Sequence, residues 1–191
     1  MADSYFPKGM PLPQGTVDDQ EYWAWTRRHR LMIQRCTKCG TFRHNPIPFC
    51  YNCRALEYVW VDQIPPIGVV YSFTIVRAPA HPALVGRPPF NIVLVELPRA
   101  GGVRLASNLV DLRGGDGKEP VSQVARWNSP AKVPAFEPDP KSIYVGMPVE
   151  VVWEDHEDVT LPLFMPSADP EAVAAAERHP KAAPPKTGRT G

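Results

Sequence analysis

Hydrophobic positions alternate with polar ones over much of residues 58–166, which is the period of strands that bury one face. These stretches are also rich in β-branched and aromatic residues, as strands usually are. They predict strands at 58–61, 67–76, 90–97, 103–110, 144–155 and 159–166. Because helices do not alternate with these strands, we expect a mainly β fold in which about five of them form a small closed or partly closed barrel.

A helical pattern precedes the strands. Prolines in residues 1–15 predict an extended N-terminal arm, and a capping signal at Thr16 predicts a helix over about 17–29. The aromatic side chains on this helix are Tyr22, Trp23 and Trp25. They are interpreted either as core packing or as a surface for a partner protein, where Trp and Tyr are favoured.

Two other stretches lack a strand pattern. Residues 112–142 are polar and rich in glycine and proline, and so long a loop in a compact domain usually has a function, which the sequence does not indicate. The tail contains a helix start at Pro170 and ends in a segment that is expected to be disordered. The expected parts are an arm and helix (1–30), a cysteine-containing module (31–57), a barrel domain (58–166) and a tail (167–191).

Composition narrows the class of protein. The formal net charge is +1, so no overall basic charge favours nucleic acid. The start of the chain shows no basic segment followed by an apolar core, and no apolar run approaches the roughly 20 residues of a membrane span. We therefore expect a cytoplasmic protein without a membrane segment, in which paired cysteines are more often metal ligands than disulfides.

The four cysteines follow the pattern C-x2-C-x10-C-x2-C. Each C-x-x-C pair turns two thiolates toward one point, and two pairs complete a tetrahedron around zinc. Gly40 directly after the first pair suits such a tight turn. Four thiolates leave no open coordination position, so the metal is expected to be structural; iron in a rubredoxin-like site remains the alternative. The expected ligands are Cys36, Cys39, Cys50 and Cys53.

Motifs of a self-sufficient enzyme are missing from the sequence. It contains no GxSxG, HExxH, P-loop or GxGxxG motif, and no cysteine is left over as a nucleophile. The DHED segment at 155–158 is interpreted as an exposed turn between strands. Basic residues near the cysteine pairs form either a solvated face or a contact for the phosphates of a nucleic acid or of coenzyme A. These residues are Arg35, Lys38, Arg43 and Arg54.

Taken together, these stretches resemble a known family. The aromatic helix leads into RLMIQRCTKCGTFRHNPIPFCYNC, GVVYSFTIV opens the barrel, NIVLVEL is followed by a strand ending in SNLVD, and VGMPVEVVWED and LPLFMP close it. Over roughly residues 18–166 the chain resembles the zinc-ribbon plus OB-fold proteins of domain-of-unknown-function family thirty-five. The resemblance implies an N-terminal helix, a rubredoxin-like zinc ribbon and a five-stranded OB-fold barrel. Segment 112–142 and the tail depart from the family pattern.

Members of that family are typically partners of thiolase-superfamily enzymes. The resemblance implies a non-catalytic accessory subunit that docks to a thiolase-like catalytic subunit in a hetero-oligomer and helps to bind coenzyme A. The complex would act on acyl-CoA thioesters by thiolytic or retro-aldol cleavage of a carbon–carbon bond, or by the reverse reaction. The acyl group, the choice among these reactions and the stoichiometry stay open. The alternative is a nucleic-acid-binding module, because zinc ribbons and OB-folds also serve that role, but the net charge of +1 counts against it.

Overall fold

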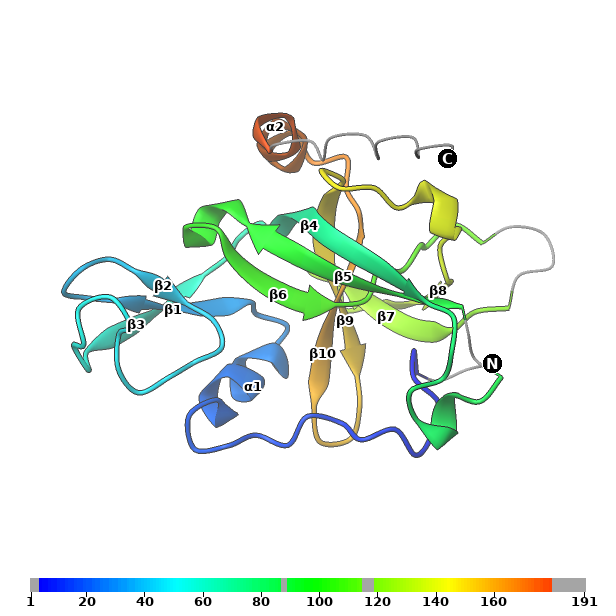
Figure 1. The fold of residues 1–191 in the computed structure, drawn as a ribbon, viewed down its shortest axis with the longest axis horizontal. Helices are drawn as coiled ribbons and strands as arrows, with labels where there is room; N and C mark the ends of the chain where they lie inside the picture. Colours follow the sequence, from blue (N-terminus) through cyan, green and yellow to red (C-terminus); the bar gives the residue numbers. More distant parts are fainter. Residues whose placement is uncertain (1–3, 87–88, 115–118, 180–191) are drawn as a thin grey trace, which may run out of the picture.

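The computed structural model describes residues 4–86, 89–114 and 119–179. Figure 1 shows two β-sheets, with helix α1 and the N-terminal arm along one side and helix α2 on the opposite side. The helices are α1 (Gln20–Thr26) and α2 (Pro170–Arg178), with short 3-10 turns at Pro82–Leu84, Pro98–Ala100 and Pro140–Ser142. The strands are β1 (Met32–Cys36), β2 (Phe42–Arg43), β3 (Tyr58–Asp62), β4 (Ile67–Val76), β5 (Phe90–Leu97), β6 (Val103–Ser107), β7 (Ser122–Arg126), β8 (Lys132–Ala135), β9 (Pro148–Asp155) and β10 (Thr160–Pro166).

The smaller sheet has three strands in the order β2-β1-β3, and all of its pairs are antiparallel. Strand β3 pairs with β1 over its full length, from Met32 opposite Asp62 to Cys36 opposite Tyr58. The sequence pattern assigned this strand to the barrel domain, but it forms an edge of the cysteine-containing module. The chain therefore passes from the small sheet to the large one after Asp62.

The larger sheet has seven strands in the order β6-β5-β4-β9-β7-β8, and β10 pairs with β9. Strands β6 and β10 curl toward each other without forming a ladder. A bridge joins Leu109, two residues after β6, to Phe164 of β10, and the Ser107 hydroxyl donates to the Pro162 carbonyl at 2.7 Å. We call this unpaired edge between β6 and β10 the seam.

Strand β9 is buried on both faces, which explains the unbroken apolar run of Val151, Val152 and Trp153 at its centre. Val151 belongs to the cluster inside the curled sheet, together with Trp153. Its neighbour Val152 points the other way, into a second cluster that also contains Tyr5 of the N-terminal arm. Successive side chains of a strand alternate between faces, so a run of apolar residues is required where both faces are covered.

The mainly β fold is confirmed, but two expected elements differ. The 112–142 segment contains β7 and β8, so the sheet has seven strands where about five were expected. Both strands are short, and β8 contains Pro134, so their pattern is weak. Helix α1 is shorter than 17–29, because His29 adopts a left-handed backbone (φ 55°) that turns the chain into β1.

The tail helix is confirmed as α2, and Asp169 caps it by accepting hydrogen bonds from the amides of Glu171 and Ala172. Small residues of α2, Ala175 and Ala176, pack against Val69 of β4. The end that was expected to be disordered, 180–191, lies outside the described residues. Among the described helices, none is long and apolar enough to cross a membrane.

Candidate metal centre

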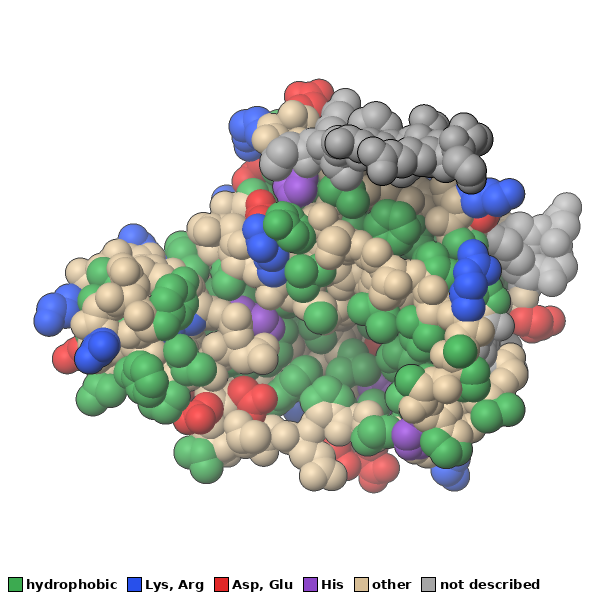
Figure 2. Space-filling model, in the orientation of Figure 1, with side chains coloured by type: hydrophobic (Ala, Val, Ile, Leu, Met, Phe, Trp, Pro, Cys, Tyr) green, Lys and Arg blue, Asp and Glu red, His purple; other side chains and the backbone are tan. Residues whose placement is uncertain are grey.

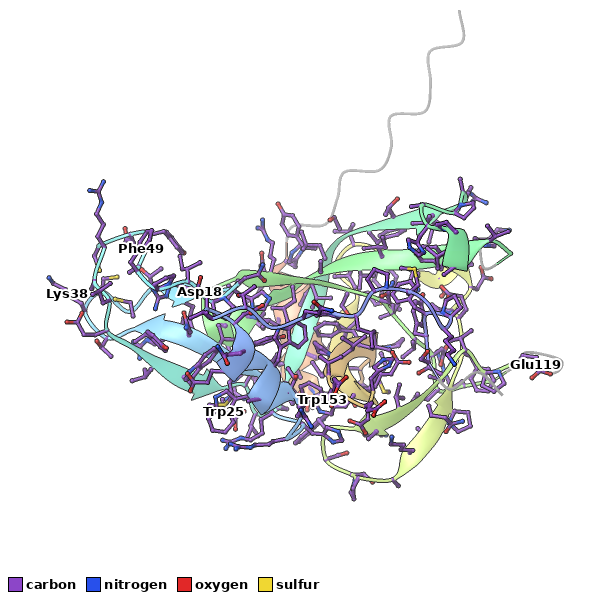
Figure 3. The ribbon with its side chains drawn as sticks, turned by 90° about the horizontal axis from the view of Figure 1, so that it is seen from below. Asp18, Trp25, Lys38, Phe49, Glu119 and Trp153 are labelled. Atoms are coloured by element: carbon purple, nitrogen blue, oxygen red, sulfur yellow. The ribbon has the colours of Figure 1, made fainter. Side chains whose placement is uncertain are left out.

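The four cysteine side chains converge at the far end of the small sheet, although 17 positions separate the first from the last. Their sulfur atoms all lie within 4.8 Å of one another. Figure 3 shows the sulfurs between the labelled side chains of Lys38 and Phe49, away from the barrel. The Sγ atoms of Cys36 and Cys53 are 3.6 Å apart, and those of Cys39 and Cys50 are 3.5 Å apart.

Two turns of the same geometry hold these side chains. In the first, the Gly40 amide donates to the Cys36 carbonyl at 3.0 Å; in the second, the Arg54 amide donates to the Cys50 carbonyl at 2.7 Å. The residue after each second cysteine has a left-handed backbone, with φ of 76° at Gly40 and 62° at Arg54. Glycine adopts this conformation without strain, whereas arginine does so at a cost. Arg54 therefore occupies a conformation in the second turn that glycine would adopt at less cost.

The surroundings shift the pKa values of individual cysteine thiols in different directions. The Thr41 hydroxyl, 3.1 Å from the sulfur of Cys39, lowers the pKa of that thiol to about 5. The Ala55 amide also lowers the pKa of Cys53, but the neighbouring Cys39 and the other thiols outweigh it and raise that pKa to about 12. Four sulfurs this close cannot all ionise without a cation between them.

Two family models match consecutive parts of the chain. The ChsH2 rubredoxin-like zinc ribbon domain matches residues 23–59, and the ChsH2 C-terminal OB-fold domain matches residues 60–121. A solved structure entitled "Ltp2-ChsH2(DUF35) aldolase" contains a chain that is 31% identical, with a TM-score of 0.59. The match covers 81% of this protein and 98% of that chain. This chain belongs to the ChsH2-like DUF35 family.

Two curated relatives of this DUF35 chain carry names of enzyme subunits. One is the "Probable enoyl-CoA hydratase alpha subunit" of Thermomonospora curvata, which is 32% identical over 167 residues. The other is the "3-oxo-4,17-pregnadiene-20-carboxyl-CoA hydratase alpha subunit" of Mycobacterium tuberculosis, which is 31% identical over 173 residues. Each match covers 86% of this chain but only 43% and 42% of the two relatives, so the chain spans less than half of their length.

The DUF35 ribbon fits a zinc ion. A tetrahedron with Zn–S bonds of about 2.3 Å has S–S edges of about 3.8 Å, close to the two shortest separations here. Thiolates are the preferred soft ligands of zinc, and two of the sulfurs are buried from water. The cofactor is therefore structural zinc, for which these four cysteines would supply every ligand. A closed site of this kind stabilises the ribbon and leaves no position for a substrate.

The predicted basic residues do not share one surface. Arg35, Lys38 and Arg54 are exposed near the cysteine turns, and the Arg35 guanidinium lies 5.7 Å from the centre of the Phe42 ring. Arg43 is only 1% exposed, and its guanidinium lies 5.3 Å from the centre of the Tyr58 ring. Among the described residues no hydrogen-bond partner reaches its three guanidinium nitrogens. Arg43 faces inward because it lies opposite the buried Gln34 on β1.

The three aromatic residues of α1 also separate. Tyr22 is only 3% exposed and belongs to the barrel core, so its position does not suit a partner contact. Trp23 is half-buried, and its indole nitrogen donates to Asp19 at 3.1 Å. Trp25 lies at the outer side of α1, where the guanidinium groups of Arg28 and Arg30 flank its ring at 4.9 and 5.2 Å. Trp23 and Trp25 are both half-buried, so either could contribute part of its ring to a partner contact, whereas Tyr22 could not.

The sequence did not single out the most exposed apolar surface of the ribbon. We call it the ribbon patch; its members are Phe49, Tyr51, Leu56, Tyr58 and Val59. They come from the second cysteine turn and from the exposed edge strand β3. Leu56 is 66% exposed although it is one of the larger aliphatic side chains. Tyr58 and Val59 are consecutive in β3 and point to opposite faces, so the ribbon patch extends around this edge of the small sheet. Exposed apolar side chains gathered on one small module often mark a protein–protein interface.

Proposed function

We propose that this DUF35 chain is a non-catalytic accessory subunit of an enzyme complex that acts on acyl-CoA thioesters. It would dock through its zinc ribbon to a thiolase-like catalytic subunit in a hetero-oligomer. The reaction of that complex would cleave or form a carbon–carbon bond by thiolysis or by aldol chemistry. The partner would carry the catalytic residues, and this chain would complete the assembly.

One observation carries the proposal. The solved chain that is 31% identical matches this protein over 98% of its own length, and its title couples two names, Ltp2 and ChsH2(DUF35), to an aldolase. The curated relatives are named alpha subunits of CoA hydratases, so they too are components of assemblies that act on CoA thioesters. A chain of the same family and of similar size to the solved one is a good candidate for the same kind of role.

The ribbon patch supports the docking part of the proposal. Five large apolar side chains are exposed within residues 49–59, and Trp25 lies on the neighbouring helix. Tyr and Trp are enriched where protein interfaces are energetically important. The zinc would hold this surface rigid before docking, which reduces the entropy lost on binding.

The three exposed basic residues support a contact with coenzyme A. Arg35, Lys38 and Arg54 lie beside the ribbon patch, so a phosphate at the edge of the docked surface would be within reach of their charges. Arg43 is left out of this set because it is buried.

Co-expression tests the docking. The chain is produced together with the thiolase-like protein encoded beside it, and the pair is analysed by gel filtration and by cleavage of an acyl-CoA substrate. We expect co-elution and an activity that requires both chains. Leu56→Asp should weaken the complex at least tenfold, because it places a charge in the ribbon patch. The matched control is Val85→Asp, which changes a 75% exposed residue outside the ribbon. A partner that is fully active alone would refute the proposal.

Charge reversal tests the contact with coenzyme A. Arg35→Glu and Lys38→Glu should each raise the KM of the complex for acyl-CoA by about threefold or more, with little change in kcat. Arg77→Glu, at an exposed site outside the ribbon, is the control. An unchanged KM in both ribbon variants would remove this contact from the proposal and leave the docking intact.

A further inference from the structure

A cavity of about 560 Å³ lies at the seam between β6 and β10. The strands contribute Leu94 and Leu105 from one side and Leu163 from the other. The N-terminal arm, helix α1 and the ribbon loop 44–46 cover the remaining sides. Figure 2 shows hydrophobic side chains in a hollow on this face, above the arm. Its volume is within the range of about 300–1,000 Å³ that is usual for small-molecule sites.

Most polar groups on the cavity wall are already bonded within the protein. The Ser107 hydroxyl donates to the Pro162 carbonyl, and the Asn108 amide donates to the backbone carbonyl of Asn91. The wall that remains for a ligand is mainly aliphatic and aromatic. A ligand would therefore gain free energy chiefly by removing apolar surface from water.

The charges around the cavity disfavour an anion. Asp19 lines it, and although partial burial raises the pKa of this carboxyl, hydrogen bonds from Thr16 outweigh the burial and keep it ionised. Arg104 also lines it, but its guanidinium is bound to Glu96 at 3.0 Å and lies 3.4 Å from the centre of the Tyr71 ring. The one arginine on this wall, among the described residues, is therefore already paired with a carboxylate.

Of the polar side chains on the wall, His44 is the one that packs against the core. Its ring packs edge-on against Tyr22, with 5.1 Å between centroids, and it makes no hydrogen bond to the described residues. Burial lowers the pKa of His44 to about 4, so the imidazole is neutral at physiological pH. A neutral imidazole offers one N–H donor and one acceptor nitrogen.

We propose that the seam cavity binds an uncharged lipophilic molecule, an alkyl chain or alicyclic ring, whose single hydroxyl or carbonyl group hydrogen-bonds to His44. Hydrogen-bond capacity at one end of an apolar cavity fixes the orientation of such a ligand. The site does not involve the exposed basic residues of the ribbon, so it is separate from the proposed contact with coenzyme A.

Fluorescence displacement tests the site with defined probes. The zinc-loaded full chain is titrated with N-phenyl-1-naphthylamine, an uncharged dye that brightens in apolar surroundings, and the dye is then displaced by decanol, decanoate or decylammonium at pH 7.5. We expect saturable dye binding and displacement by decanol at concentrations at least tenfold lower than either charged analogue. Equal or better displacement by decanoate or decylammonium would overturn the assignment of an uncharged ligand, and absence of saturable dye binding would overturn the site.

Two variants locate the binding. Ala106→Trp adds an indole at an exposed position that lines the cavity and should lower dye affinity at least tenfold, whereas Ala131→Trp, at an exposed position outside it, should not. His44→Phe keeps a ring against Tyr22 and removes both nitrogens; it should retain the dye and lower decanol affinity at least fivefold. Circular dichroism and zinc content confirm that each variant is folded. Unchanged binding in Ala106→Trp, or unchanged decanol affinity in His44→Phe, would contradict the proposal.

The outcome is independent of the proposed accessory function. A chain that co-elutes with a catalytic partner but does not bind the dye would retain the function and lose this site. A chain that binds decanol but never docks would keep this binding site and lose the proposed accessory function.

Discussion

Asn91 offers the sharpest test of how the large sheet is held together. This residue is 1% exposed. Its side chain hydrogen-bonds to both backbone groups of Leu109, in the way that a neighbouring strand would. The side-chain amide donates to the Leu109 carbonyl at 2.8 Å, and the side-chain oxygen accepts from the Leu109 amide at 2.7 Å. The same amide also donates to Glu137 at 2.8 Å and to the Tyr5 hydroxyl at 3.2 Å. One side chain thus joins the barrel, the N-terminal arm and the 112–142 segment.

The perturbation is Asn91→Leu, which keeps a similar volume and removes every side-chain hydrogen bond. The amide and carbonyl of Leu109, a fully buried residue, would both lose their partners. A buried polar group without a partner costs about 1–3 kcal/mol, so two of them cost about 2–6 kcal/mol. We expect the free energy of unfolding to fall by about 4 kcal/mol, which is a large share of the roughly 5–15 kcal/mol of a typical domain.

Urea unfolding with zinc present, followed by circular dichroism and tryptophan fluorescence, measures this loss. The control is Asn128→Leu, which changes an exposed asparagine and should stay within about 0.5 kcal/mol of the natural protein. A midpoint shift with an unchanged slope would show that stability changed and the extent of unfolding did not. A loss below about 1 kcal/mol for Asn91→Leu would refute the role of this side chain.

Three further predictions concern the zinc, a close backbone approach and acid stability. Cys36→Ser should release most of the zinc and unfold the ribbon, which elemental analysis and circular dichroism would detect; a folded, metal-loaded variant would contradict the structural role. Gly68→Ala should lower the melting temperature, because an added Cβ would lie 2.3 Å from a methyl carbon of Val95, and overpacking of this kind costs about 1–3 kcal/mol; an unchanged melting temperature would show that β5 yields easily. Burial alone would raise the pKa of Asp155, but hydrogen bonds from His29, Thr160 and Lys132 hold it below the usual 3.8. Its contribution is present above that value and is lost as the pH falls through the lower folded pKa, so Asp155→Asn should flatten the loss of stability below about pH 4 in acid titrations. An equally steep acid transition in Asp155→Asn would argue against a stabilising role for the hydrogen bonds to Asp155.

The features that the sequence predicts best are those that depend on a local pattern of residues. Strands β4, β5 and β9 carry long β-branched stretches, and the cysteine ligands follow a fixed spacing that is closed by two turns. Strand β7 escaped prediction because its pairing with β9 is distant in the chain, and β8, which pairs only with its neighbour β7, is short and contains Pro134. Ala125 lies opposite Trp153 of β9, and this register has no signal within SQVAR or KVPA. Propensity is a weak guide where pairing and burial decide the structure.

The positions of individual side chains were harder to predict. Arg43 reads as one more surface cation of the ribbon, yet β2 places it opposite the buried Gln34. Tyr22 reads like Trp25, but the helical period turns Tyr22 into the core and leaves Trp25 at the rim. A two-residue strand and a seven-residue helix are too short for a sequence period to decide which side faces inward.

The metal centre and the seam cavity are linked through one segment of chain. The ten residues between Cys39 and Cys50 form a loop whose two ends the zinc would fix, and the middle of that loop, 44–46, covers the cavity. The loop contains two prolines; its first part includes β2, which pairs with β1, and further along the Ile47 amide donates to the Gln34 side chain at 3.4 Å. Closing a loop removes conformations of the unfolded chain, so the metal would restrict the cavity wall as well as the ribbon. His44 directly follows β2, so its position depends both on the pairing of β2 with β1 and on the loop ends that the zinc would fix.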